Sequence, residues 1–251
     1  YTDVPLELGI AAIGGCSSLT SITGLDCHRD AETGLIFEGL NEKEKVIGFS
    51  GTVESVKIPD SVTTIGLSAF NGCTTLKSID LGEVQVIEDN AFNSCTNLTT
   101  ITFPNTLRTI GDWAFGGGTG LTVLALPEGV VSIGIGAFGH SKLKEVILPN
   151  SIENIGNECF AYSNDLEKVT LPGNLQTVGR SMFHSCKALK SIKIPEGITT
   201  IEQSAFHSCL ALEYVWLPTS LKSIGSSAFF GCTALNHINI PLGVTTFGTT
   251  V

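Results

Sequence analysis

Hydrophobic and polar positions repeat along most of the chain with a period of 22 or 23 residues. Each unit reads Leu-x-x-Ile-x-Leu-Pro, then x-x-Val-x-x-Ile-Gly, then x-x-Ala-Phe-x-x-Cys. An aliphatic or aromatic residue followed by proline marks the units at Ile58, Phe103, Leu126, Leu148, Leu171, Ile194, Leu217 and Ile240, with Leu81-Gly82 in the one gap. A phenylalanine marks them again at Phe70, Phe92, Phe115, Phe138, Phe160, Phe183, Phe206 and Phe229. Two markers with one period predict a repeat protein.

The order of residues within one unit predicts a three-sided coil. Ile192 and Ile194 alternate with Lys193, which is the period of a strand with one buried face. Pro195 ends that strand because proline has no backbone N–H to donate. The Val-x-x-Ile part predicts a second short extended stretch, and Ala-Phe predicts one 3₁₀ or helical turn. One coil cannot bury its inward residues alone, so successive coils are expected to stack into a solenoid.

The repeated motif resembles the BspA-like (Treponema pallidum type) leucine-rich repeat of surface proteins. The resemblance rests on IPDSVTTIG at 58–66, followed by SAFNGCTTLKSI at 68–79, and it extends over about residues 53–247. It implies an α/β-class but β-rich solenoid, a curved right-handed stack of coils. A parallel β-sheet is expected on the concave side and short 3₁₀ or helical turns on the convex side.

The ends of the chain differ from the middle. We expect an N-terminal cap at 1–52, made of a partial repeat at about 10–25 and a β-hairpin insert at about 26–52. The hairpin is indicated by two apolar runs, at 35–37 and 46–49, that flank a polar segment. Residues 53–251 are predicted to hold the repeats, with the last one incomplete.

Composition and charge limit the classes of function. The 251 residues are 42% hydrophobic and 15% charged, which predicts a folded chain. The formal net charge of −10 disfavours nucleic acid as a partner, because phosphate backbones are bound mainly through basic surface. No apolar stretch is long enough to span a bilayer, so no membrane insertion is expected in this segment. No signal peptide is present in the sequence given.

Most of the eight cysteines follow the repeat. One column of the repeat contains Cys16, Cys73, Cys95, Cys186, Cys209 and Cys232. Because Gly118 and Ser163 take the same position, the column predicts buried thiols that hydrogen-bond weakly to the backbone rather than disulfides. Cys159 stands at the alanine position of its unit, which is again a core position. Cys27 lies outside the column, and a Cys16–Cys27 disulfide stays open as an alternative.

Metal-binding and catalytic readings find little support. His184 and His207 follow the core phenylalanine of consecutive units, so stacking places them within about 5 Å of each other. Two histidines without a third ligand leave a zinc shell incomplete, which favours exposed histidines on the convex side. Residues 116–118 are a glycine run without the lysine of a phosphate-binding loop. No column supplies a nucleophile, a base and an orienting acid. We therefore expect no metal, no cofactor and no enzymatic activity.

The outward positions of the first strand vary while the inward positions do not. The third position of each unit reads Ser78, Thr100, Val123, Glu145, Lys168, Ser191, Tyr214 and His237. The fifth position reads Asp80, Thr102, Ala125, Ile147, Thr170, Lys193, Trp216 and Asn239. Exposed aromatic residues beside cations are typical of interaction hot spots. The candidate binding residues on the concave face are Tyr214, Trp216, Lys193, Lys168, His237, Ile147 and Glu145.

These observations predict a binding module with a protein or glycan partner. The resemblance implies display on the cell surface or secretion, and adhesion to host matrix proteins or to other cells. A structural spacer in a larger surface protein, without a ligand of its own, is the alternative hypothesis. Tyr214 and Trp216 also fit a second interpretation, in which a neighbouring chain or further coils cover an apolar patch formed by the two residues. The residues do not indicate an oligomeric state.

Overall fold

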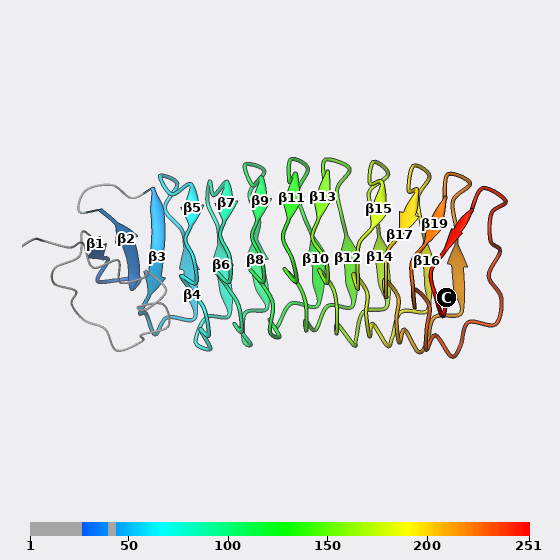
Figure 1. Ribbon diagram of the computed structural model, residues 1–251. Coiled ribbons are helices and arrows are strands. Elements are labelled where there is room, and N and C mark those ends of the chain that lie inside the picture. The colour runs from blue at the N-terminus through cyan, green and yellow to red at the C-terminus, as the bar shows by residue number, and fades with distance from the viewer. Residues whose placement is uncertain (1–26, 40–43) are drawn as a thin grey trace, which may run out of the picture.

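The computed structural model describes residues 27–39 and 44–251 and places them in one row of stacked coils (Figure 1). The expected partial repeat at about 10–25 lies outside the described residues. Each coil has three sides, which we call the first-strand face, the second-strand face and the turn face. The repeat solenoid predicted from the sequence is confirmed, with parallel strand pairing between coils.

Three-residue strands form the first-strand face, the side expected to be concave. They are β4 (Ser55–Lys57), β6 (Ser78–Asp80), β8 (Thr100–Thr102), β10 (Val123–Ala125), β12 (Glu145–Ile147), β14 (Lys168–Thr170), β16 (Ser191–Lys193) and β18 (Tyr214–Trp216). They pair in parallel in three groups, β4-β6-β8, β10-β12-β14 and β16-β18. The central residue of each strand points inward, as with Leu124 (0% exposed) and Ile192 (2% exposed).

Two-residue strands form the second-strand face. They are β5 (Thr64–Ile65), β7 (Val86–Ile87), β9 (Thr109–Ile110), β11 (Ser132–Ile133), β13 (Asn154–Ile155), β15 (Thr177–Val178), β17 (Thr200–Ile201), β19 (Ser223–Ile224) and β20 (Thr246–Phe247). The sheet that runs from β5 ends at β13, and a second sheet runs from β15 to β20. The face is therefore interrupted once, between β13 and β15.

An antiparallel unit precedes the coils. Strands β1 (Cys27–Arg29), β2 (Leu35–Glu38) and β3 (Lys45–Phe49) pair in sequence order, and β3 then pairs in parallel with β5. The hairpin thus extends the second-strand face rather than the first. The Phe49 ring lies 5.2 Å from the Phe70 ring, which joins this unit to the common core.

The turn face contains hydrogen-bonded turns, where the sequence predicted a 3₁₀ or helical turn. No helix occurs in residues 27–39 and 44–251. The cause is local, because each turn holds residues in the left-handed region, such as Ser68 (φ 55°) and Gly72 (φ 69°). A left-handed residue cannot continue a right-handed helix. Instead, the Ser68 and Phe70 N–H groups donate to the carbonyl oxygens of Asp89 and Ala91 in the next coil, at 3.0 and 2.8 Å.

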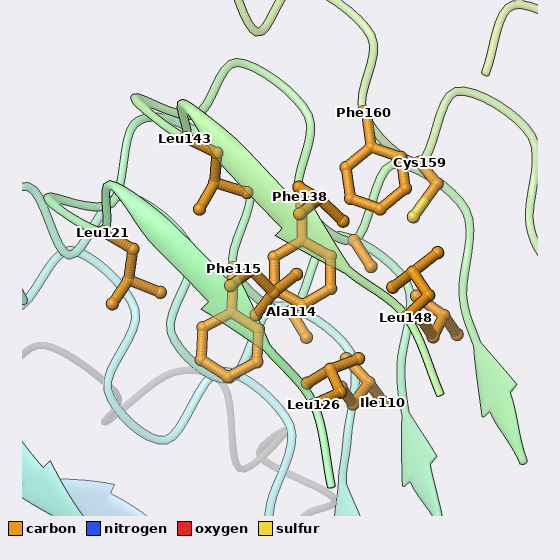
Figure 2. Close-up of a cluster of buried hydrophobic side chains, with 14 of the residues drawn as sticks. Ile110, Ala114, Phe115, Leu121, Leu126, Phe138, Leu143, Leu148, Cys159 and Phe160 are labelled. Atoms are coloured by element: carbon orange, nitrogen blue, oxygen red, sulfur yellow. The ribbon is translucent and has the colours of Figure 1, made fainter. Parts of the chain in front are cut away.

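A stack of phenylalanine rings fills the centre of the solenoid (Figure 2). Phe115 lies 5.3 Å from Phe138, and Phe138 lies 5.9 Å from Phe160, with nearly parallel planes. Leu121 and Leu143 from neighbouring coils, together with Leu126 and Leu148, surround these rings (Figure 2). The contact repeats from coil to coil, so the core is continuous along the axis.

Candidate binding face

Tyr214 and Trp216 lie together on the outer surface of β18. Val215 between them is 7% exposed, whereas Tyr214 and Trp216 are 53% and 55% exposed. Their ring centroids are 6.1 Å apart with an interplanar angle of 25°. The alternation of a strand places both rings on one side. Two large aromatic side chains are thus held exposed on a rigid element.

Strand β16 brings a cation beside this pair. In the β16-β18 ladder, Lys193 is the register partner of Trp216, and Ser191 is the register partner of Tyr214. Lys193 is exposed. Directly opposed residues on one face have Cβ atoms about 4.5–5.5 Å apart. The structure therefore brings Lys193, Tyr214 and Trp216 into one patch.

Glu145, Lys168 and Ile147 form a second group on the same face. Lys168 is the register partner of Glu145, and its Nζ donates to Glu145 Oε1 at 2.5 Å. Ile147 is 44% exposed on the same strand as Glu145. No strand pairing joins β14 to β16 among the described residues. Six of the seven candidate residues thus divide into two neighbouring groups instead of one continuous sheet.

His237 does not join either group through strand pairing. Within the described part of the chain, residues 237–239 form no strand, and β18 pairs only with β16. No backbone N–H of residues 236–239 donates to β18, so the place of His237 in the column of Tyr214 stays a prediction. His237 is exposed, but the sheet register does not fix its position.

The N-terminal half of the first-strand face has a different chemistry. Its outward residues include serine and threonine side chains, and Ser78 Oγ donates to Ser55 Oγ at 2.8 Å, but Lys57 and Asp80 also point outward there. Thr100 and Thr102 continue this surface. Exposed aromatic side chains on this face lie on β18, whereas β4, β6 and β8 present hydroxyl and charged side chains.

Four cysteines of the column, Cys95, Cys186, Cys209 and Cys232, are buried as predicted, whereas Cys73 is only partly buried. Cys186, Cys209 and Cys232 each donate from Sγ to the carbonyl oxygen of the core phenylalanine one coil earlier, at 3.1 to 3.2 Å. Ser163 donates from Oγ to Phe138 at 3.2 Å in the same way. Burial raises the pKa of the Cys186 thiol well above its ordinary value. The Cys186 thiol therefore stays protonated and unreactive. Cys27 is buried on β1, whereas Cys16 lies outside the described residues, so the Cys16–Cys27 alternative is not decided.

The sequence predicted the His184–His207 contact, at 4.7 Å, but missed that it belongs to a longer column of rings on the turn face. It contains Trp113, His140, Tyr162, His184, His207 and Phe230, with consecutive centroids 4.6 to 6.4 Å apart. His184 and His207 directly follow the core phenylalanine, but His140 and Tyr162 stand one residue later. That shift hides the column from a comparison of equal repeat positions.

His184 is the most perturbed histidine of this column. Partial burial, and then the proximity of His207, lower the pKa of its imidazole, while Glu158 opposes the shift. The two imidazole rings are stacked, with centroids 4.7 Å apart and planes within 14°. The described residues contain no group of three or more histidine, cysteine, aspartate or glutamate side chains arranged to hold a metal ion.

Comparison with known families agrees with this geometry. The BspA type Leucine rich repeat region matches residues 48–167 and 153–251, in six copies. The chain belongs to the BspA-type leucine-rich repeat family. A comparison with curated proteins found no match. Residues 27–39 and 44–251 include no helix suited to crossing a membrane.

Solved structures of bacterial leucine-rich repeat proteins are similar to this one. A leucine-rich repeat protein from Bacteroides ovatus is 29% identical, with a TM-score of 0.72 over 91% of this chain. The chain spans 60% of the length of that protein. The T. pallidum leucine-rich repeat protein is 24% identical, with a TM-score of 0.56, over 86% of this chain and 90% of its own, and shares the fold. The pneumococcal vaccine antigen PcpA is 26% identical, with a TM-score of 0.52, over 78% of this chain and 58% of its own.

Proposed function

We propose that this chain is a non-enzymatic binding module of a secreted or cell-surface bacterial protein, and that its first-strand face engages a protein partner. The observation that carries the proposal is the patch of Tyr214, Trp216 and Lys193, in which two aromatic rings are more than half exposed beside a cation. Similarity to a pneumococcal vaccine antigen supports display outside the cell.

The chemistry of the patch favours a protein partner. Tyrosine and tryptophan provide large contact areas and lose little conformational entropy on binding. Ile147 and Val123 add exposed apolar surface on neighbouring coils, at 44% and 54% exposure. Lys193 would favour an acidic side chain in the partner, although the whole chain is acidic. The Glu145–Lys168 ion pair would lie at the rim, where charged pairs contribute mainly to orientation.

The test replaces Tyr214 and Trp216 together with alanine and measures binding to intact cells and to immobilised extracellular-matrix proteins. Removing a hot-spot pair should weaken binding about thirtyfold or more. Phe230→Ala is the matched control, because Phe230 is 49% exposed but lies on the turn face. Equal binding by the parent and the double variant would contradict the proposal. Binding to glycans alone would reassign the patch to a glycan partner.

A structural spacer is the second candidate. The continuous phenylalanine stack and the hydrogen bonds between coils favour it, because they make a rod that resists bending. A spacer requires length but no particular face. Adhesion that falls when the number of coils is reduced, yet is unchanged in the Tyr214→Ala, Trp216→Ala variant, would support the spacer.

A further inference from the structure

The second-strand face opens at one place, between β13 and β15. At the junctions on either side, Glu153 N–H donates to Val131 O at 2.9 Å and Thr199 N–H donates to Gln176 O at 2.8 Å. Across β13 and β15, the N–H groups of Gln176, Thr177 and Gly179 donate to no backbone oxygen of the preceding coil among the described residues. The β13 and β15 backbones therefore lack the ladder of hydrogen bonds that joins β11 to β13 and β15 to β17.

The opening is confined to this face. On the turn face of the same two coils, Glu158 N–H donates to Arg180 O at 2.9 Å and Phe160 N–H donates to Met182 O at 3.0 Å. On the first-strand face, β12 and β14 pair in register. The two coils are thus held together on two sides and separated on the third, which makes a slot and not a break in the solenoid.

Two core residues explain the separation. The position before the core phenylalanine is alanine at Ala69, Ala91, Ala114, Ala137, Ala205 and Ala228. In the two coils that flank the slot it is Cys159 and Met182, which are 0% and 1% exposed. Larger side chains in a position that fits alanine push the packed strands apart.

Gly156, Gly179 and Gly225 each follow the second strand of their coil directly, and the space around them agrees with this account. A Cβ placed on Gly156 or Gly225 would lie 2.4 or 2.5 Å from a backbone atom of the preceding coil. At Gly179, the nearest backbone atom of the preceding coil, Ile155 O, would lie 3.8 Å away, and Met182 Cε would lie 3.4 Å away. The backbone of the preceding coil therefore lies more than 1 Å farther from Gly179 than from the other two glycines, and the Asn157 side chain, with Oδ1 at 3.3 Å, lies between them.

The slot is partly open to solvent, has a volume of about 460 Å³ and has a mostly polar lining. This volume lies within the range of about 300–1,000 Å³ that small-molecule sites occupy. Its polar side chains come from both coils: Glu153, Asn154, Asn174, Gln176 and Thr177. Each amide offers two donors and one acceptor, and the hydroxyl offers both. The unpaired backbone groups add donors from one coil and acceptors from the other.

This mixture selects a class of ligand. No lysine or arginine lines the slot, so an anion lacks a counter-charge, and one carboxylate is too few for a hard divalent cation. Hydroxyl groups, which donate and accept at once, match a lining of amides and paired backbone donors and acceptors. We propose that the slot between β13 and β15 is a binding site for a neutral mono- or disaccharide.

The test uses saturation-transfer NMR with D-galactose, N-acetyl-D-glucosamine and lactose as probes. At least one of them should receive saturation from the parent protein. Thr177→Val should weaken that binding about tenfold, because one hydrogen bond is lost. Thr200→Val, which is the same change at the closed β15–β17 junction, should leave the binding unchanged. Met182→Ala, which restores the residue of the other coils, should close the slot and abolish the signal.

Several outcomes overturn the proposal. They are no transfer to any of the three probes, equal losses in Thr177→Val and Thr200→Val, or full binding by Thr177→Val. If Met182→Ala does not fold, as judged by circular dichroism, the comparison of Thr177→Val with Thr200→Val still tests the proposed site. The Tyr214→Ala, Trp216→Ala variant should bind the sugar like the parent, which separates this site from the first-strand face.

Discussion

The Cys209 thiol donates a hydrogen bond to the carbonyl oxygen of Phe183, 3.1 Å away and one coil earlier. The Phe183 ring occupies the centre of the core, so its carbonyl is buried with it. Buried carbonyl groups need partners. The phenylalanine column therefore fills the core, and the cysteine column donates hydrogen bonds to the carbonyl groups that the phenylalanines bury. This division of roles explains why serine replaces cysteine at Ser163.

The buried thiols should resist alkylation until the protein unfolds. Burial raises the pKa of Cys159 and Cys186, so almost no thiolate exists in the folded state at neutral pH. We expect iodoacetamide to modify native protein first at Cys73, which is only partly buried, and to modify Cys95, Cys186 and Cys209 only in denaturant. Peptide mass mapping after a short pulse measures this order. Rapid native labelling of Cys186 would contradict the assigned burial.

The same thiols predict a loss of stability at high pH. Their folded-state pKa lies above the unfolded value of about 8.5, so the unfolded chain releases protons first as the pH rises. The contribution is complete below about pH 8.5 and decreases above it. Urea unfolding at pH 7.5 and pH 10 should show a lower free energy of unfolding at pH 10. A Cys186→Ser variant should show a smaller difference between the two pH values than the parent.

Replacing Phe160 with alanine tests the continuity of the core. The Phe160 ring is fully buried and lies 5.9 Å from Phe138 and 5.7 Å from Phe183. The cavity should lower the free energy of unfolding by about 3–5 kcal/mol. Lys144→Ala, at an exposed position, should change it by less than about 0.5 kcal/mol. Similar losses for the two variants in urea unfolding would contradict the assignment of inward and outward positions.

Thr119 offers a stabilising change. Its side chain is fully buried, and Oγ1 is a buried side-chain atom without a hydrogen-bond partner in the described structure. Valine has nearly the same shape and no hydroxyl, so Thr119→Val should raise the free energy of unfolding by about 1 kcal/mol. Thr122→Val, at an exposed position, is the control and should have little effect. A destabilised Thr119→Val variant would show that the hydroxyl has a partner in solution.

The features of the fold that could be predicted are those that the repeat encodes in every unit. Phe115 and Phe138 recur at one spacing, and stacking them needs no information from outside the repeat. The alternation around Val215 likewise predicted that Tyr214 and Trp216 point outward. Periodicity alone decides such positions because each coil contacts only its neighbours.

The remaining features depend on departures from the repeat. Met182 stands in a column of alanines, but only the packed structure shows that the second-strand face is open beside it, at Gly179. The turn face forms no helix because some of its residues have left-handed backbone conformations. Ser68 is one of them, and serine as a residue type does not indicate that conformation. His237 follows the column spacing, yet strand pairing stops at β18. Local deviations act through neighbouring coils, which the pattern of a single unit does not describe.

His184 should make the protein sensitive to acid. Burial and the adjacent His207 lower its pKa in the folded state, so the unfolded chain binds a proton at higher pH than the folded chain does. Stability from this group is complete above the ordinary value of about 6.5 and is lost as the pH falls below it. NMR titration should show His184 with a midpoint below that value. His184→Phe keeps a ring in the column, as Phe230 does, and should lose less stability than the parent between pH 7 and pH 5. His237→Gln, an exposed position outside the column, should keep the parent's pH dependence. An identical loss in the parent and His184→Phe would assign the acid sensitivity to other groups.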